Sequence, residues 1–239
     1  MALALVSGIG TLTDAIVAAI IAFRLRKPAR EDGYSYKTFR GSFFWFFAIF
    51  SIFALFMSGP LYFHDPVNAG YGYVIGHFFL YLSCAVFFYA PFNIITPDRK
   101  LIPNILATIV FLTSIPVTII NWLAYANGDN VPEYSNGVVL WRPPDIVAKY
   151  IPLTVGLTYL IFGFGLFMYH SRSTTDAFLK RRSKFISLGF LLLSFSGPLH
   201  DQTWKDNIAP YVIGLADFLV LLGFIFIAIA ILPKRSQTS

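Results

Sequence analysis

The sequence is poor in charge. Only 13% of its 239 residues are charged, and acidic residues number 12. An ordinary soluble domain carries about 25% charged residues, so this chain lacks the polar surface that a globule in water needs. The composition therefore excludes a soluble enzyme and a disordered chain.

The sequence is also poor in cysteine. Its one cysteine, Cys84, lies inside an apolar run, which excludes a disulfide scaffold. The net charge of +6 does not form a patch, because the basic residues sit in short segments between apolar runs. We therefore expect no nucleic-acid partner.

Long apolar runs dominate the chain, which is 56% hydrophobic with a mean hydropathy of +0.66. Each run is continuous and close to the ~20 residues that a helix needs to cross a bilayer. The composition predicts an all-α integral membrane protein, a single domain 1–239 with seven transmembrane helices. The expected spans are Ala2–Phe23, Gly41–Phe63, Tyr71–Ile95, Leu101–Ala126, Val147–Tyr169, Phe185–Leu199 (extending back into Lys180–Lys184) and Pro210–Leu232.

Lysine and arginine are distributed unevenly between the loops. The segments after the first, third, fifth and seventh spans carry 15 of the 18 basic residues, and the other side has only Arg142, Lys149 and Lys205. Cytoplasmic loops of membrane proteins are enriched in basic residues. The bias predicts a multi-pass protein with the N-terminus outside and the C-terminus in the cytosol, in contact with membrane lipids.

Two short blocks recur with one offset. Ser58–Leu61 (SGPL) returns as Ser196–Leu199, and Tyr73–Gly76 (YVIG) returns as Tyr211–Gly214, both 138 residues later. The shared offset indicates a parallel 3+1+3 internal repeat. Repeat 1 covers about residues 2–96, the linker helix 101–126 and repeat 2 about 147–232. The prolines in the SGPL blocks either end helices or bend them around a cavity.

This architecture resembles that of transporters with parallel repeats: sugar exporters of the SWEET type, PQ-loop proteins and nicotinamide-riboside transporters. The resemblance implies a substrate path between the two halves, near the midplane. The chain departs from these families because it has no Pro-Gln pair and no Trp-x-x-Trp. Microbial rhodopsins have the same number of helices, but the last span here has no lysine for a retinal Schiff base.

Three ionisable residues lie inside apolar runs: Asp14, His77 and Asp217. Such groups are costly in hydrocarbon and usually line a cavity or form pairs. His77 and Asp217 lie two residues apart in the repeat register, which predicts a pair at matching depth. We expect all three to bind a ligand or a proton. The alternative is a buried pair that fixes helix packing.

A second polar cluster follows the second and sixth spans. His64, His200 and Asp201, together with His77, could bind a metal such as zinc on the outer side, and haem is a further alternative. The pair of histidines four apart that marks some membrane hydrolases is missing. The cofactor therefore stays unknown at this point.

Aromatic residues gather towards the predicted outer face. Tyr62, Tyr73, Trp204 and Tyr211 are candidate cavity aromatics, and the alternative is an interfacial belt. The outer loop 127–146 contains Asn-Gly and Pro-Pro turn signals. They are consistent with a hairpin that covers the bundle mouth or with a simple connector.

These features favour a transporter or channel for a small solute or ion, proton-coupled and with an outward-opening polar cavity. The first alternative is a non-catalytic sensor or complex subunit that binds a ligand, metal or haem at the outer cluster. A homo-oligomer or another membrane subunit would be its partner. The third is a membrane-embedded metal-dependent enzyme, which we rank last because no convincing catalytic constellation is present.

Overall fold

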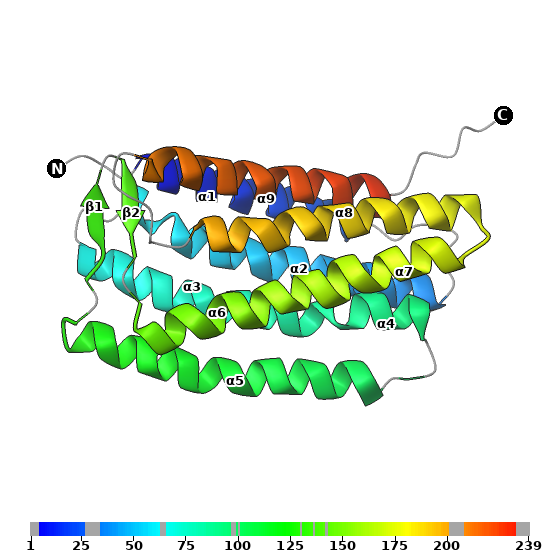
Figure 1. Ribbon diagram of the computed structural model, residues 1–239, viewed down its shortest axis with the longest axis horizontal. Helices are drawn as coiled ribbons and strands as arrows, with labels where there is room; N and C mark the ends of the chain where they lie inside the picture. Colours follow the sequence, from blue (N-terminus) through cyan, green and yellow to red (C-terminus); the bar gives the residue numbers. More distant parts are fainter. Residues whose placement is uncertain are drawn as a thin grey trace.

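Seven helical passes lie side by side in an elongated bundle (Figure 1). The computed structural model describes residues 5–26, 34–62, 66–96, 99, 101–129, 131–135, 137–141, 143–200 and 208–232. The passes are α1 (Leu5–Leu25), α2 (Tyr34–Met57), α3 (Pro66–Phe87) with α4 (Tyr89–Ile95), α5 (Leu101–Ala126), α6 (Asp145–Leu157) with the π-helix η2 (Thr158–Gly165) and α7 (Leu166–Ser173), α8 (Ala177–Leu199) and α9 (Ala209–Ile231).

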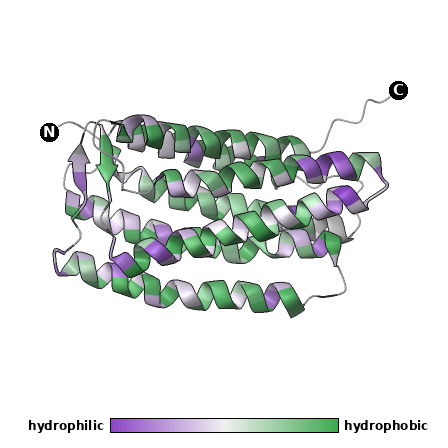
Figure 2. Cartoon of the chain, viewed as in Figure 1, coloured by the Kyte–Doolittle hydropathy of each residue, from purple (hydrophilic) through white to green (hydrophobic). Residues whose placement is uncertain are grey.

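The two ends of the bundle differ in structure and charge. One end carries an antiparallel hairpin of β1 (Glu133–Ser135) and β2 (Val138–Leu140), together with the short helix η1 (Gly59–Leu61). We call it the hairpin end. At the opposite end, hydrophilic residues gather where α7 is followed by α8 (Figure 2). We call it the basic end, after Arg24, Arg40, Arg172 and the run Lys180–Lys184.

Hydrophobic residues occur along all the helices (Figure 2), and many of them are exposed on the outside of the bundle. Among the described residues, six passes are long and apolar enough to cross a membrane. α8 is less apolar, because it has four basic residues near its start. Large apolar side chains such as Ile9, Ile109 and Phe218 are exposed. A surface of this kind indicates a polytopic membrane protein.

The helix bounds agree closely with the expected apolar segments. The fourth expected span coincides with α5, and α8 begins at Ala177, so the sixth span does extend back through its basic residues. The third pass is interrupted at Phe88, between α3 and α4. Pro91 explains the interruption, because it has no N–H to donate and its ring clashes with the carbonyl group of Phe87, four residues earlier.

Phenylalanine fills the half of the bundle nearer the basic end. Phe87 and Phe190 have ring centroids 4.3 Å apart, and Phe47 and Phe224 5.1 Å apart. Eight fully buried rings from five passes form this layer, which we call the phenylalanine layer. They are Phe39, Phe43, Phe46, Phe47, Phe87, Phe167, Phe190 and Phe224.

The two copies of the sequence repeat have different surroundings. The first SGPL block leaves α2 and forms η1, whereas the second remains in α8. Tyr73 is buried between neighbouring passes, while its counterpart Tyr211 is 79% exposed. The sequence identity of the blocks therefore does not extend to equal packing, and the 3+1+3 repeat stays a prediction.

Candidate functional site

The inner face of α1 changes character halfway along the helix. Towards the hairpin end, Ser7 and Asp14 are buried on the same face, and Gly10 lies between them. Towards the basic end the buried residues are apolar: Ala15, Ala18, Ile21, Ala22 and Leu25. Residues three, four or seven apart share a helix face. α1 therefore presents a polar half to the bundle interior at the hairpin end only.

Asp217 of α9 lies directly against this polar half. A Cβ atom added to Gly10 would overlap the Asp217 carboxylate, so the glycine allows α9 to place its carboxylate on the backbone of α1. Asp14 follows Gly10 by one helical turn, and its charge interacts with that of Asp217. Asp14 is 4% exposed and Asp217 7% exposed. The structure thus brings two buried carboxyl groups together between α1 and α9.

His200, the residue that follows α8, holds one oxygen of this carboxylate. Its Nε2 atom lies 2.9 Å from Asp217 Oδ1, and its Nδ1 atom lies 3.0 Å from the carbonyl oxygen of Ser196. Because a carbonyl oxygen only accepts, Nδ1 carries a proton. One further proton must then lie between Nε2 and Oδ1, on either atom. The pair is an imidazolium–carboxylate pair or a neutral imidazole that accepts from a carboxylic acid.

The second oxygen of Asp217 has no such partner. Oδ2 is buried and forms no hydrogen bond with any residue in the described part of the chain. An unsatisfied oxygen of this kind is costly in a buried position. Oδ2 packs against Gly10, and as an unpaired carboxylate oxygen it can accept a proton.

His77 of α3 borders the same site. Its Nδ1 atom lies 2.9 Å from the carbonyl oxygen of Tyr73, so it adopts the same tautomer as His200, with Nε2 able to accept. His77 and His200 are close enough for their charges to interact. The ring of His77 also packs on that of Tyr73, with centroids 4.0 Å apart.

The hairpin covers this end of the bundle and contacts the site from above. The N–H group of Val6 donates to the carbonyl oxygen of Gly137, and that of Val139 donates to Ser7 Oγ. The ring of Trp141, directly after β2, packs against that of Tyr73 in a tilted arrangement, with centroids 4.8 Å apart. The hairpin is therefore attached both to the polar half of α1 and, through Tyr73, to His77.

Alternate side chains of β2 point to different helices, as in any strand. Val138 packs with Ala209 and Ile213 of α9, while Val139 packs with Tyr73 and its aromatic neighbours. The strand thus joins the two sides of the bundle mouth. The sequence predicted a hairpin or a connector in this loop, and the structure contains the hairpin.

The other residues singled out in the sequence lie elsewhere. Tyr62 is 54% exposed, and Tyr211 is more exposed still, so neither side chain is enclosed by the bundle. His64, Asp201 and Trp204 lie outside the described residues. Within the residues that are described, no three His, Cys, Asp or Glu side chains are grouped so as to hold a metal ion.

One partner differs from the sequence expectation. The repeat register paired Asp217 with His77, whereas the structure gives its hydrogen bond to His200. The reason is packing, because α9 lies between α1 and α8, and α3 packs on α2 and α5. Sequence reasoning also overlooked Gly10, although a small residue one turn before a buried aspartate is a signal for close helix approach.

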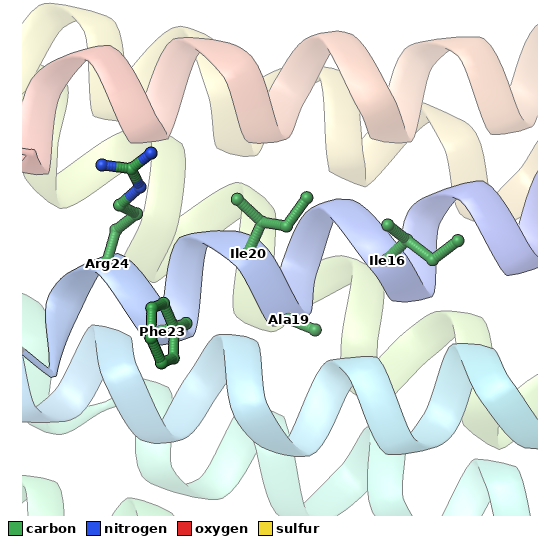
Figure 3. A pocket seen from close by; sticks show the side chains of 5 residues that line it. All are labelled: Ile16, Ala19, Ile20, Phe23 and Arg24. Atoms are coloured by element: carbon green, nitrogen blue, oxygen red, sulfur yellow. The ribbon is translucent and has the colours of Figure 1, made fainter.

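A shallow groove on the outside of the bundle is distinct from this site. It is lined from α1 alone by Ile16, Ala19, Ile20, Phe23 and Arg24 (Figure 3). Its lining is apolar apart from Arg24 at the basic end. In a bilayer this surface would meet acyl chains, with the arginine reaching towards the headgroups.

Fold and site together define a polytopic helical membrane protein with a buried His/Asp site near one end. Comparisons with protein-family models, curated proteins and solved structures found no match to this chain. Its function must therefore be argued from the site.

Proposed function

We propose that this chain is a membrane transporter or channel that moves a small solute or ion, and that Asp14, Asp217, His200 and His77 bind the coupling proton or cation. The observation that carries this proposal is the buried Oδ2 atom of Asp217, near Asp14, which has no hydrogen-bond partner among the described residues. The site would open towards the hairpin end when the hairpin moves.

The charges of the site favour a positively charged ligand. With both carboxyl groups ionised and one imidazolium, the three groups Asp14, Asp217 and His200 have a net charge of −1. A negative charge in a low-dielectric interior is costly. Binding of one proton or one monovalent cation would neutralise it, which makes occupancy of the site sensitive to the outside pH or cation concentration.

The packing of the bundle suits a protein that exposes its site to one side at a time. The ionisable groups of the site, Asp14, His77, His200 and Asp217, lie in the half nearer the hairpin end, while the phenylalanine layer fills the half near the basic end. In this proposal the hairpin is the outer barrier and the phenylalanine layer is the inner one. The basic end faces the cytosol, following the positive-inside distribution, and the 3+1+3 repeat provides the two halves that move.

Flux measurements on aspartate variants test the proposal. The protein is reconstituted in liposomes with a pH-sensitive dye inside, and an imposed pH gradient drives uptake of protons. We expect Asp14→Asn and Asp217→Asn to abolish the gradient-driven flux, since both lose a titratable carboxyl group in the site. Asp145→Asn is the matched control, because Asp145 is exposed in the first turn of α6.

Full flux in both site variants would show that Asp14 and Asp217 do not bind the coupling proton, and absence of flux in the wild-type protein would count against transport. A second candidate function, a sensor of outside pH or cations, is favoured by the contact series from Trp141 through Tyr73 to His77. That series would carry a change at the site to the hairpin without any passage through the phenylalanine layer. A sensor would show a pH-dependent change in Trp fluorescence but no flux in the wild-type protein.

A further inference from the structure

A polar stripe runs along α3 from the site into the apolar half of the bundle. Tyr73, His77, Tyr81 and Cys84 are spaced by four, four and three residues, so they share one face of the helix. Tyr81 and Cys84 are fully buried. Cys84 lies seven residues beyond His77, which is about 10 Å further from the hairpin end along a helix.

The inner part of this stripe meets the π-helix η2. Tyr159 of η2 is 3% exposed, and the side chains of Ser83 and Cys84 are its polar neighbours. The hydroxyl groups of Tyr81 and Tyr159 are both buried, and neither forms a hydrogen bond of good geometry with the described residues. Thr154 is the polar neighbour of the Tyr81 hydroxyl group. Rings of the phenylalanine layer surround Tyr159, with Phe190 at 5.5 Å and Phe46 at 6.1 Å.

The backbone at this position is also unusual. η2 spans eight residues, Thr158–Gly165, and π-helical segments inside α-helices are frequent at functional sites. Ser187 of α8 donates to the carbonyl oxygen of Phe164 at 2.9 Å, so a neighbouring pass satisfies a backbone group of the widened turn. The segment is therefore fixed by a contact from outside its own pass.

We propose that Tyr81, Cys84 and Tyr159 form an inner hydrated site, which holds water or a hydronium ion on the route from the Asp14–Asp217 site to the basic end. This inference rests on the proposed transport function. Two phenol groups and a thiol can each donate and accept a hydrogen bond, which suits water and protons. A buried water typically satisfies about three such groups.

The thiol of Cys84 provides a direct test, because the chain has no other cysteine. After exchange in D2O the thiol gives an S–D stretching band, which lies clear of the solvent O–D band and of other protein bands. The wild-type protein in liposomes is transferred to D2O, and the S–D band and the amide II band are followed together. We expect the S–D band to appear at once, while the amide II band of the helix core persists.

An S–D band that appears only as slowly as the core amide hydrogens exchange would overturn the proposal, because no water would then reach Cys84. This measurement uses the unmodified protein and does not depend on flux. It therefore shows whether water reaches the inner site even if the aspartate variants show that the proposed function is wrong.

A flux experiment tests whether the inner site lies on the route. We expect Tyr159→Phe to slow proton flux about fivefold, the size of one lost hydrogen bond, without changing the pH at which flux is half-maximal. Tyr125→Phe is the matched control, since the Tyr125 hydroxyl on α5 is also buried without a partner in the described residues but lies off the stripe. Equal flux in Tyr159→Phe and wild type would show that the Tyr159 hydroxyl group does not take part in proton transfer.

Discussion

Replacement of Gly10 by alanine tests the geometry on which the site depends. The added Cβ atom would overlap the carboxylate of Asp217. The carboxylate is the far end of a flexible side chain, so it can rotate away at little steric cost. That rotation breaks the hydrogen bond to His200, and the loss of this bond is the main expected effect.

The magnitude follows from two opposing effects. A hydrogen bond to a charged group contributes about 1.5–3 kcal/mol, while alanine favours a helix over glycine by about 1 kcal/mol. We therefore expect Gly10→Ala to lower the free energy of unfolding by about 0.5–2 kcal/mol. For a chain of this length that corresponds to a fall in Tm of roughly 1–8 °C.

Thermal unfolding in detergent, followed by tryptophan fluorescence, measures this change. The matched control is Gly156→Ala in α6, where an added Cβ meets no atom within 4 Å and the variant should be neutral or slightly more stable. A double-mutant cycle then isolates the cause. In a His200→Gln background the hydrogen bond is already altered, so Gly10→Ala should cost much less there. The same cost in both backgrounds would show that Asp217 does not occupy the position described.

Three further predictions concern the pH response, the hairpin and the topology. Burial lowers the pKa of His200, but the hydrogen bond and the charge of Asp217 outweigh it and leave this pKa above its ordinary value of 6.5. The stabilisation by the His200–Asp217 pair is therefore complete below about pH 6.5 and declines as the pH rises through the folded-state pKa of His200. The difference in Tm between wild type and His200→Gln should shrink towards alkaline pH. A difference that does not change with pH would contradict a charged pair. Trp141→Ala should speed access of a water-soluble quencher to the site, because it removes the ring that packs against Tyr73, whereas Trp141→Phe should retain most of the closure. Equal access in both variants would exclude the hairpin as a barrier. A cysteine that replaces Ser135 should react with an impermeant thiol reagent added outside, and one that replaces Ser236 should react only from the cytosolic side. The reverse pattern would show that the bundle has the opposite orientation in the membrane.

Several features of the fold could be predicted because they depend on local physics. Bilayer thickness fixes the length of an apolar helix, so α5 matches its expected bounds of Leu101–Ala126. α8 begins at Ala177 and includes its four basic residues, in agreement with the predicted extension of the sixth span into Lys180–Lys184. The costs of burying a carboxyl group or an imidazole marked Asp14, His77 and Asp217 as unusual before any contact was known.

The partners of these residues could not be read from the chain. A repeat offset of 138 suggested that His77 meets Asp217, but the helix neighbours are set by packing over the whole bundle. Gly10 lets α9 approach α1, and Gly189 and Gly223 do the same for α8 and α9, since a Cβ on either would meet the backbone carbonyl oxygen of the other within 2.8 Å. These close approaches bring His200 to Asp217.

The sequence by itself determined that the chain is a helical membrane protein, how long its passes are and which buried groups are ionisable. These properties follow from the transfer of single segments between water and hydrocarbon, which depends only on local composition. The tertiary structure alone decided which carboxylate oxygen is paired, which tyrosine is buried and where the widened turn of η2 meets Cys84. Those outcomes depend on contacts between residues far apart in the chain, and in a bilayer such contacts are selected by close packing and by the need to satisfy each buried polar group.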